Sequence, residues 1–327
     1  MSEHIEFMKE ALRLAQKAAF FVAPNPMVGA VLVKNKKIIA KGYHKEFGGS
    51  HAEVDAINQC SDPAGATLYV NLEPCDHQGK TPPCTDLIIK SGIKEVVIAK
   101  KDPKRNGIEK LESAGIKVTT GILEEEAAEL NKKFFLTCEK KRPFITLKAA
   151  ISIDGKIAKK RTEQTWLTGE ESSKYAHQLR AEHQGILLGS GTVNSDNPHL
   201  GVRHNNGNDP LRIILAGENA IPKDSKIFRD ENYLISKGKN LNELMQELYE
   251  QNIHSILVEG GARIYNSFIK EKLVDEYIFL IAPKVLGKNS LNFSEFEDEL
   301  PLEILSMQKL GQDMKVHAKA KWDSNNG

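Results

Sequence analysis

The chain has 327 residues, which is long enough for two domains of ordinary size, each with a core of its own. Apolar residues make up 40% of the chain and charged residues 27%, as in an ordinary globular protein. The net charge of +1 argues against nucleic acid or an anionic membrane surface as a partner, and no apolar run is long enough to span a membrane. Residues 3–19 follow a helical pattern, so we do not expect a signal peptide.

The chain contains only four cysteines, at positions 60, 75, 84 and 138. Cys75 and Cys84 belong to a metal-like cluster described below, and nothing suggests that disulfides hold the fold together. We therefore expect a cytoplasmic protein. The sequence leaves open whether the chain forms a homo-oligomer.

The first half of the chain alternates strands and helices, which predicts a three-layer α/β domain whose far side is largely parallel. In chain order we expect a helix over 3–19, a hairpin of strands 27–33 and 37–42, a helix over 51–60 capped by Ser50, a strand over 66–72, a helix over 85–91, a strand over 95–100, a helix over 107–114 and a strand over 117–120. Residues 124–139 have the pattern of one charged helix. The run 140–143 predicts a boundary between domains 1–141 and 142–327.

The chemistry of the first half centres on His51, Glu53, Cys75 and Cys84. Imidazole and thiolates are zinc ligands, and a catalytic zinc site uses three protein ligands and keeps one position open. His51, Cys75 and Cys84 supply three ligands, and both cysteines follow a proline near an expected helix start. Glu53 stands two residues from His51, so it can move a proton between the attacking water and a leaving amine. This order of residues is the signature of zinc-dependent nucleobase deaminases.

Simpler interpretations of the same residues remain open. A buried cysteine is often an ordinary core residue, and a structural zinc site closes with four ligands. No fourth Cys or His has the usual tight spacing, although His77 is close enough to be considered. His44 either lines the pocket or lies at the end of a strand.

The two cysteines are separated by eight residues, where the generic signature has two. This spacing, together with the run Pro24-Asn25-Pro26-Met27-Val28-Gly29, resembles the deaminase domain of the RibD family of bifunctional riboflavin biosynthesis proteins. The resemblance implies a cytidine-deaminase-like three-layer α/β/α fold with one zinc ion per chain. It also implies hydrolytic deamination of 2,5-diamino-6-ribosylamino-4(3H)-pyrimidinone 5′-phosphate.

The sequence departs from the family pattern at Asp55, Asp76 and Thr85. In addition, residues 102–108 stand where the family commonly has a longer glycine-rich loop, so we expect a shorter pocket wall there. None of these differences removes a predicted metal ligand or Glu53.

The second half again mixes strands and helices. We expect a strand over 144–153 running into 154–158, a helix over 171–183, strands over 185–189, 211–216, 233–236 and 255–258, helices over 241–251 and 262–271, and late strands over 276–282 and 315–320. Gly260 and Gly261 join a hydrophobic strand to a helix. Small residues there either let backbone amides approach a phosphate or simply allow a tight turn. The sequence around Gly260 and Gly261 does not match G-x-G-x-x-G, the pattern of dinucleotide-binding turns.

Three runs, 148–155, 191–198 and 259–261, resemble the reductase domain of the same family. The resemblance implies a dihydrofolate-reductase-like α/β fold that uses NADPH to reduce the ribosyl chain to ribityl, giving 5-amino-6-ribitylamino-uracil 5′-phosphate. It implies NADPH contacts at Ala150, Trp166, Thr192, Asp196, Gly261, Ala262, Arg263, Ile264, Tyr265, Asn266 and Ser267, and substrate contacts at Gln164, Arg180, Leu200, Arg203 and Glu259.

Some of these residues have alternative roles. Arg180 and Arg203 suit a phosphate because guanidinium groups bind it in a bidentate way, but they can equally form surface ion pairs. Trp166 can equally be a core aromatic residue.

Two rival functions fit parts of the sequence less well. One is a deaminase of free cytosine compounds or of tRNA, which the neutral charge, the long cysteine spacing and the attached second half disfavour. The other is a non-catalytic protein stabilised by zinc, which has no use for Glu53 beside the metal.

Overall fold

The structure, a computed structural model, describes residues 2–79, 82–160, 165–203, 207–217 and 220–321. The chain divides into two compact units, residues 1–140 and 141–327, and each is described by itself. Within the described residues, no helix is both long and apolar enough to cross a membrane.

The first unit is built on a five-stranded sheet in the order β2-β1-β3-β4-β5. These strands are β1 (Gly29–Lys34), β2 (Lys37–Tyr43), β3 (Thr67–Leu72), β4 (Glu95–Lys100) and β5 (Lys117–Thr120). β1 pairs antiparallel with both β2 and β3, whereas β3, β4 and β5 run parallel. The far side of this sheet is therefore parallel, as the alternating sequence pattern predicts.

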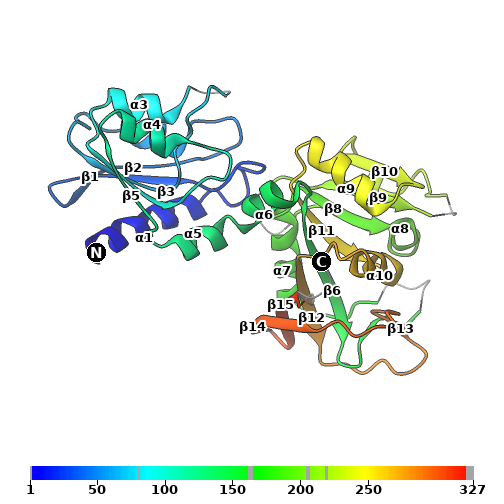
Figure 1. The fold of residues 1–327 in the computed structure, drawn as a ribbon. Helices are drawn as coiled ribbons and strands as arrows, with labels where there is room; N and C mark the ends of the chain where they lie inside the picture. Colours follow the sequence, from blue (N-terminus) through cyan, green and yellow to red (C-terminus); the bar gives the residue numbers. More distant parts are fainter. Residues whose placement is uncertain (1, 80–81, 161–164, 204–206, 218–219, 322–327) are drawn as a thin grey trace. The chain divides into compact units, whose positions relative to one another are not determined.

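Helices cover both faces of this sheet, which makes three layers. The helices are α1 (Ser2–Gln16), α2 (Ala52–Asn58), α3 (Cys84–Lys90), α4 (Gly107–Ser113), α5 (Glu124–Leu130) and α6 (Lys132–Lys140). One core joins α2, α3 and α4 to the sheet through residues such as Ile57, Ile88 and Leu111. The other joins α1 and α5 to the opposite face through Met8 and Ala127. Figure 1 shows α3 and α4 across the sheet from α1 and α5.

Two local predictions in this unit are wrong. The segment predicted as one helix over 124–139 is interrupted at Asn131, whose side chain bonds both the amide and the carbonyl of Met27. Ser50 does not cap α2, because the helix has His51 at its N-cap without a side-chain bond, and the Ser50 carbonyl accepts a hydrogen bond from His44. At Asn131, contact with a distant residue outweighs the local helix signal.

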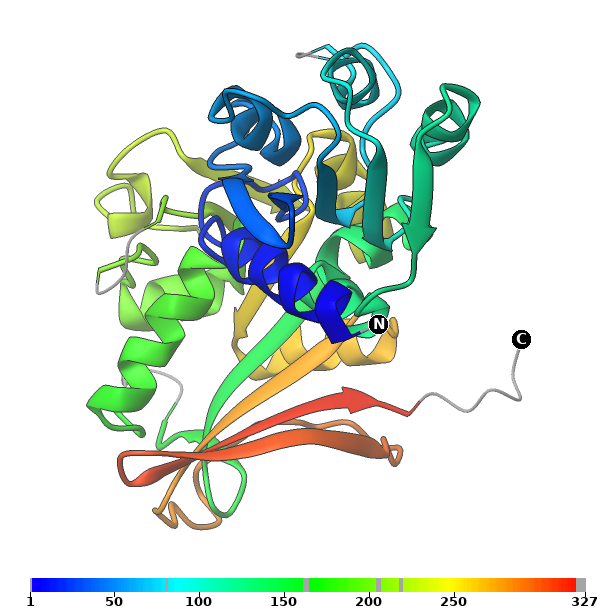
Figure 2. The same cartoon turned by 90° about the vertical axis from the view of Figure 1, so that its left-hand side faces the viewer.

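The second unit contains an eight-stranded sheet in the order β10-β9-β8-β11-β6-β12-β15-β14. Its strands are β6 (Phe144–Ser152), β8 (Gly185–Gly189), β9 (Leu211–Ala216), β10 (Tyr233–Lys237), β11 (Ser255–Gly260), β12 (Glu276–Ala282), β14 (Leu302–Leu310) and β15 (Asp313–Ala320). The strands from β10 to β12 are parallel, and β15 and β14 add an antiparallel edge. Figure 2 shows this edge as a long hairpin in orange and red.

Helices α9 (Leu241–Glu250) and α10 (Ala262–Lys270) pack on one face of this sheet, and α7 (Glu170–Ala181) and α8 (Ser190–Asp196) on the other. The short elements are β7 (Lys156–Ala158), β13 (Leu291–Asn292) and a 3-10 turn at Lys226–Phe228. The elements α8, β13 and β14 were not predicted from the sequence. Residues along β14 are mostly exposed, so its sequence lacks the apolar alternation that marks a half-buried strand.

Candidate active sites

The first unit brings His51, Cys75 and Cys84 together. Their ligand atoms lie within 4.8 Å of one another, and they are the three-residue metal-like group found among the described residues of the chain. His51 Nδ1 lies 3.2 Å from Cys84 Sγ and 3.5 Å from Cys75 Sγ. The amide of Cys84, the first residue of α3, also lies 3.3 Å from Cys75 Sγ. Cys75 itself follows β3 in a loop, so only Cys84 is at a helix start.

These separations fit a tetrahedral zinc ion. Zinc bound to imidazole nitrogen and thiolate sulfur at ordinary bond lengths keeps those atoms about 3.5 Å apart. Hydrogen bonding between the two sulfurs lowers the pKa of Cys75 and raises the pKa of Cys84, so Cys75 loses its proton more readily than Cys84 does. A thiolate that forms readily at Cys75, beside a second sulfur and an imidazole, is suited to bind a metal cation. His77 is not a member of the three-residue group and is half-exposed beside Asp76.

Glu53 lies in the first turn of α2 and is 3% exposed. Burial raises the pKa of its carboxyl to about 7, an effect only partly opposed by the charge of His51. The close approach of α2 to β2 depends on Gly42, because a Cβ at that position would lie 2.3 Å from the amide nitrogen of Ala56. Tertiary packing thus fixes Glu53 beside the three ligands in a form that can exchange a proton near neutral pH.

A cavity of about 290 Å³ opens onto this cluster. His51, Glu53 and Cys75 line it, together with Asn25 and His44. His44 Nδ1 lies 2.9 Å from the Ser50 carbonyl, which can only accept, so Nδ1 carries the proton and Nε2 accepts from the Asn25 amide at 3.0 Å. His44 therefore lines the pocket and orients Asn25, a residue that the sequence analysis quoted only as part of a motif.

The short segment 102–108 forms part of the cavity wall. Glu73 anchors it by accepting hydrogen bonds from the amides of Asp102 and Ile108 at 3.1 and 3.0 Å. Gly107 packs so tightly that a Cβ there would lie 2.0 Å from the carbonyl oxygen of Pro74. Among the described residues that line the cavity, Arg105 carries the permanent positive charge. Nothing in the local sequence around Arg105 indicates that it faces the cavity beside His51 and Cys75, so it was not among the predicted site residues.

In the second unit, Glu259 lies between two cations. It accepts hydrogen bonds from Arg180 Nε and Nη2 at 2.9 and 2.8 Å, and Lys148 Nζ lies 3.3 Å from its Oε2. Burial alone would raise the pKa of Glu259, but Arg180 and Lys148 outweigh that effect and hold it well below its ordinary value. Lys148 and Glu259 are close because β6 and β11 are adjacent parallel strands with Leu147 opposite Val258. The buried ion cluster joins two predicted substrate residues and adds Lys148.

The Gly260-Gly261 turn lies at the start of α10. Gly260 has a φ of +123°, and a Cβ there would lie 2.8 Å from the Tyr265 hydroxyl oxygen, so only glycine fits. A Cβ at Gly261 would lie 3.4 Å from Thr192 Oγ1, which places two predicted cofactor residues side by side. Tyr265 is buried, and its hydroxyl bonds the carbonyls of Lys148 and Glu259. Its side chain supports the turn.

The other predicted residues are distributed around this region. Trp166 is 74% exposed, so it is not a core aromatic residue. Leu200 is buried in a hydrophobic cluster and Arg203 is exposed. Ala150 is half-buried on β6, Asp196 ends α8, and Ala262, Arg263, Ile264, Asn266 and Ser267 belong to the first two turns of α10. Gln164 lies outside the described residues.

Comparison with known proteins covers both units. The family model described as "Cytidine and deoxycytidylate deaminase zinc-binding region" matches residues 1–100, and the one described as "RibD C-terminal domain" matches residues 143–316. The riboflavin biosynthesis protein RibD of Aquifex aeolicus (strain VF5) is 42% identical over 96% of this chain and 97% of its own length. The chain belongs to the RibD family. RibD of Bacillus amyloliquefaciens is 38% identical, with 96% of each chain covered.

Solved structures of RibD proteins agree with this assignment. RibD of Acinetobacter baumannii superposes with a TM-score of 0.94 at 32% identity over 98% of this chain and 99% of that one. The deaminase/reductase of Thermotoga maritima superposes with a TM-score of 0.91 at 38% identity, with the same shares covered. The chain is therefore a bifunctional deaminase and reductase of riboflavin biosynthesis, with zinc and NADPH as cofactors.

Proposed function

We propose that the first unit deaminates 2,5-diamino-6-ribosylamino-4(3H)-pyrimidinone 5′-phosphate and that the second reduces the ribosyl chain of the product to ribityl. The name of the Thermotoga maritima relative, a diaminohydroxyphosphoribosylaminopyrimidine deaminase and 5-amino-6-(5-phosphoribosylamino)uracil reductase, supports both substrates. The observation that carries the first step is a buried Glu53 beside three zinc-type ligands in one cavity.

In the deamination step, His51 Nδ1, Cys75 Sγ and Cys84 Sγ would hold zinc, which when bound makes water a nucleophile at neutral pH. The Glu53 carboxylate takes a proton from the attacking water and gives it to the adjacent ring nitrogen. It then takes the proton of the new hydroxyl group and gives it to the departing amine, so that ammonia leaves and a ring carbonyl remains. A carboxyl group with a pKa of about 7 can both accept and donate a proton at neutral pH, so neither direction of transfer is strongly unfavourable.

Two residues of the cavity, Asn25 and Arg105, recognise the rest of the substrate. The Asn25 amide, held by His44, presents its oxygen to the polar edge of the pyrimidinone ring. Arg105 offers a guanidinium group to the phosphate. The cavity thereby separates recognition of the ring from recognition of the phosphate.

In the second unit, NADPH supplies the hydride, and the protein binds and orients the two reactants. Ala150, Trp166, Thr192, Asp196 and the segment 261–267 are proposed to bind the cofactor. Small residues at the α10 start let backbone amides approach its phosphates. Gln164, Arg180, Leu200, Arg203 and Glu259 are proposed to bind the substrate, with Arg203 exposed and available to its phosphate.

We also propose domain limits of 1–141 for the deaminase and 142–327 for the reductase, and a cytoplasmic location. All four cysteines are free in the structure, and the proposed zinc ligands require reduced thiols.

The function is tested by incubating the full chain with the diaminopyrimidinone phosphate and measuring ammonia with and without NADPH, followed by NADPH oxidation. We expect ammonia release without NADPH and NADPH oxidation only after deamination. Ammonia without any NADPH oxidation would overturn the reductase proposal alone. NADPH oxidation before any ammonia appears would overturn the order of the two steps.

A further inference from the structure

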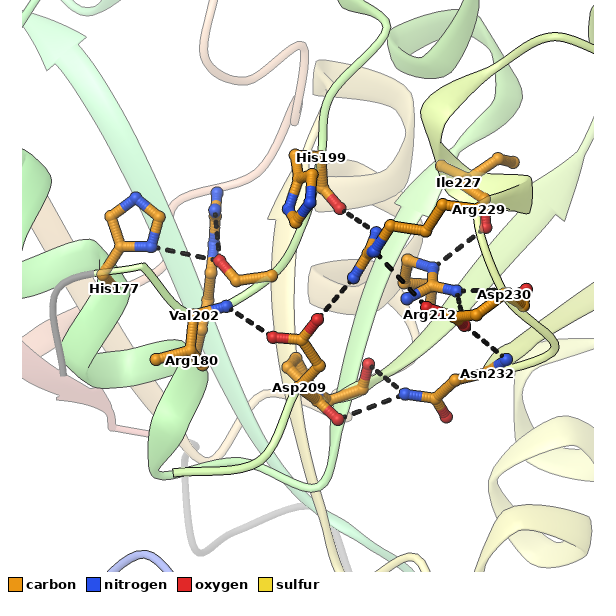
Figure 3. Close-up of polar contacts among 12 residues, drawn as sticks. His177, Arg180, His199, Val202, Asp209, Arg212, Ile227, Arg229, Asp230 and Asn232 are labelled. Atoms are coloured by element: carbon orange, nitrogen blue, oxygen red, sulfur yellow. Dashed lines mark hydrogen bonds and ion pairs between the residues drawn. The ribbon is translucent and has the colours of Figure 1, made fainter. Parts of the chain in front are cut away.

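The loop that carries Arg203 is held in place by α7. His177 and Arg180 lie one turn apart on this helix, and both reach the carbonyl oxygen of Gly201, His177 Nδ1 at 3.1 Å and Arg180 Nη1 at 3.4 Å. Figure 3 shows both side chains converging on that carbonyl. His177 is 3% exposed, so its ring is fixed by packing as well as by hydrogen bonding.

The opposite side of the loop is held by Asp209. Its Oδ1 accepts a hydrogen bond from the amide of Val202 at 2.8 Å, and its Oδ2 pairs with Arg229 at 2.6 Å. Figure 3 shows Asp209 between these two partners. A Cβ at Gly201 would lie 2.8 Å from Asp209 Oδ2, and Leu200 adopts a left-handed φ of +59°. These contacts therefore hold the backbone of residues 200–202, which leads to Arg203, in one conformation.

The tautomer of His177 follows from these contacts. A carbonyl oxygen can only accept, so Nδ1 of His177 carries the proton that it donates to Gly201. The neutral ring then has its lone pair on Nε2. Arg203 Nη2 lies 3.4 Å from that nitrogen, and a guanidinium group can only donate, so Nε2 is the acceptor. Both ring nitrogens of His177 are thus used on one loop.

We propose that His177 is a positioning residue of the reductase: its neutral imidazole orients Arg203 toward the anionic group of the substrate. The inference rests on the proposed function in one respect, the substrate role of Arg203. Arg203 is exposed, and a long side chain in water samples many rotamers unless a neighbour restricts them. A neutral acceptor restricts the guanidinium group without neutralising it, whereas a carboxylate at the same place would compete with the substrate phosphate for its charge.

Two substitutions separate the two functions of the ring. In His177→Asn, the short amide can still donate to Gly201 but cannot reach Arg203. In His177→Gln, the amide oxygen takes the place of Nε2 and can accept from Arg203. We expect His177→Asn to raise the KM for the reductase substrate by about 3- to 10-fold, as for loss of one long hydrogen bond to a charged group. The kcat and the KM for NADPH should stay unchanged, and His177→Gln should restore the wild-type KM.

The double variant His177→Asn/Arg203→Ala decides whether His177 acts through Arg203. If it does, the double variant has the same substrate KM as Arg203→Ala alone, because there is no guanidinium group left to orient. Effects that multiply would overturn the inference, as would a His177→Gln variant no better than His177→Asn. Arg203→Ala with an unchanged KM would instead remove Arg203 from the substrate site and with it the basis of the inference, whereas the deaminase proposal would be unaffected.

His183→Asn is the matched control, since His183 is 5% exposed and bonds the Leu179 carbonyl and Thr146 Oγ1 away from this loop. Denaturant unfolding monitored in the second unit, together with the KM for NADPH, reports whether each variant is folded. A rise in substrate KM in His183→Asn equal to that in His177→Asn would show a general packing effect and overturn the specific role.

Discussion

The two units of this chain handle charge in different ways. In the first, the buried carboxyl of Glu53, the thiol of Cys75 and the half-buried guanidinium group of Arg105 line one cavity. In the second, the buried charges satisfy one another, with Glu259 between Arg180 and Lys148. The difference follows from the chemistry. A hydrolytic deaminase must supply its own proton carrier, whereas a reductase whose cofactor supplies the hydride needs mainly a rigid platform.

A very large effect on deamination is expected from removing the proton carrier. Glu53→Gln should lower the rate of ammonia release by about 10²- to 10⁴-fold, the usual contribution of a general acid–base. Zinc content, and reduction of supplied deaminated intermediate, should be unchanged, because the substitution keeps the shape of the side chain. The measurements are an ammonia assay, metal analysis and NADPH oxidation.

The control for this variant is Asp55→Asn on the same helix, whose carboxylate pairs with Lys45 and does not line the cavity. It should retain ammonia release. Substantial ammonia release by Glu53→Gln would contradict the proton-transfer role.

Removal of a proposed zinc ligand should abolish one activity and spare the other. Cys75→Ser is expected to lower the zinc content from about one ion per chain to well below it, because three ligands define the site. Ammonia release should be lost together with the metal, while NADPH oxidation with supplied intermediate continues. Cys60→Ser, outside the three-residue group, should keep its zinc. An unchanged metal content in Cys75→Ser would remove Cys75 from the ligand set.

The paired charges of the second unit predict an effect on stability. Glu259→Ala leaves Arg180 and Lys148 without their shared partner, and breaking a buried ion cluster in this way costs about 3 kcal/mol or more. Denaturant unfolding monitored in the second unit should show this loss, and ammonia release should be normal. Glu303→Ala, which removes an exposed pair with Lys319, should cost less than about 1 kcal/mol. Equal losses of unfolding free energy in the two variants would mean that the buried ion cluster stabilises the second unit no more than an exposed ion pair does.

The smallest effect expected here concerns recognition in the cavity. Arg105→Gln should raise the KM for the phosphorylated deaminase substrate by about tenfold, the worth of one charge-assisted contact. For the same substrate without its phosphate, the variant and the wild type should behave alike. Lys104→Gln removes the neighbouring cation, which does not line the cavity, and should change neither KM. A similar KM rise for both substrates would indicate a change in cavity shape and not the loss of a phosphate contact.

Local patterns predicted most of the elements but not every boundary. Short continuous apolar runs identified the buried strands of both sheets, since their side chains pack against helices on both faces. The same reasoning missed β14, whose residues are largely exposed, and joined α5 and α6 into one helix. The interruption at Asn131 depends on its bonds to Met27, 104 residues earlier in the chain. No window of local sequence contains such a contact.

The sequence by itself determined the chemistry of the first unit, because the order of His51, Glu53, Cys75 and Cys84 specifies zinc ligands and a proton carrier. Only the tertiary structure decided which other side chains join them. Arg105 faces the cavity because Glu73 holds its segment, and Lys148 meets Glu259 because β6 and β11 are neighbours in the sheet. His177 is an unremarkable helical residue until the 200–203 loop folds back onto α7. The physical reason is that the type of a side chain sets which bonds it can form. Its orientation and its charged partners depend on residues that only tertiary packing brings together.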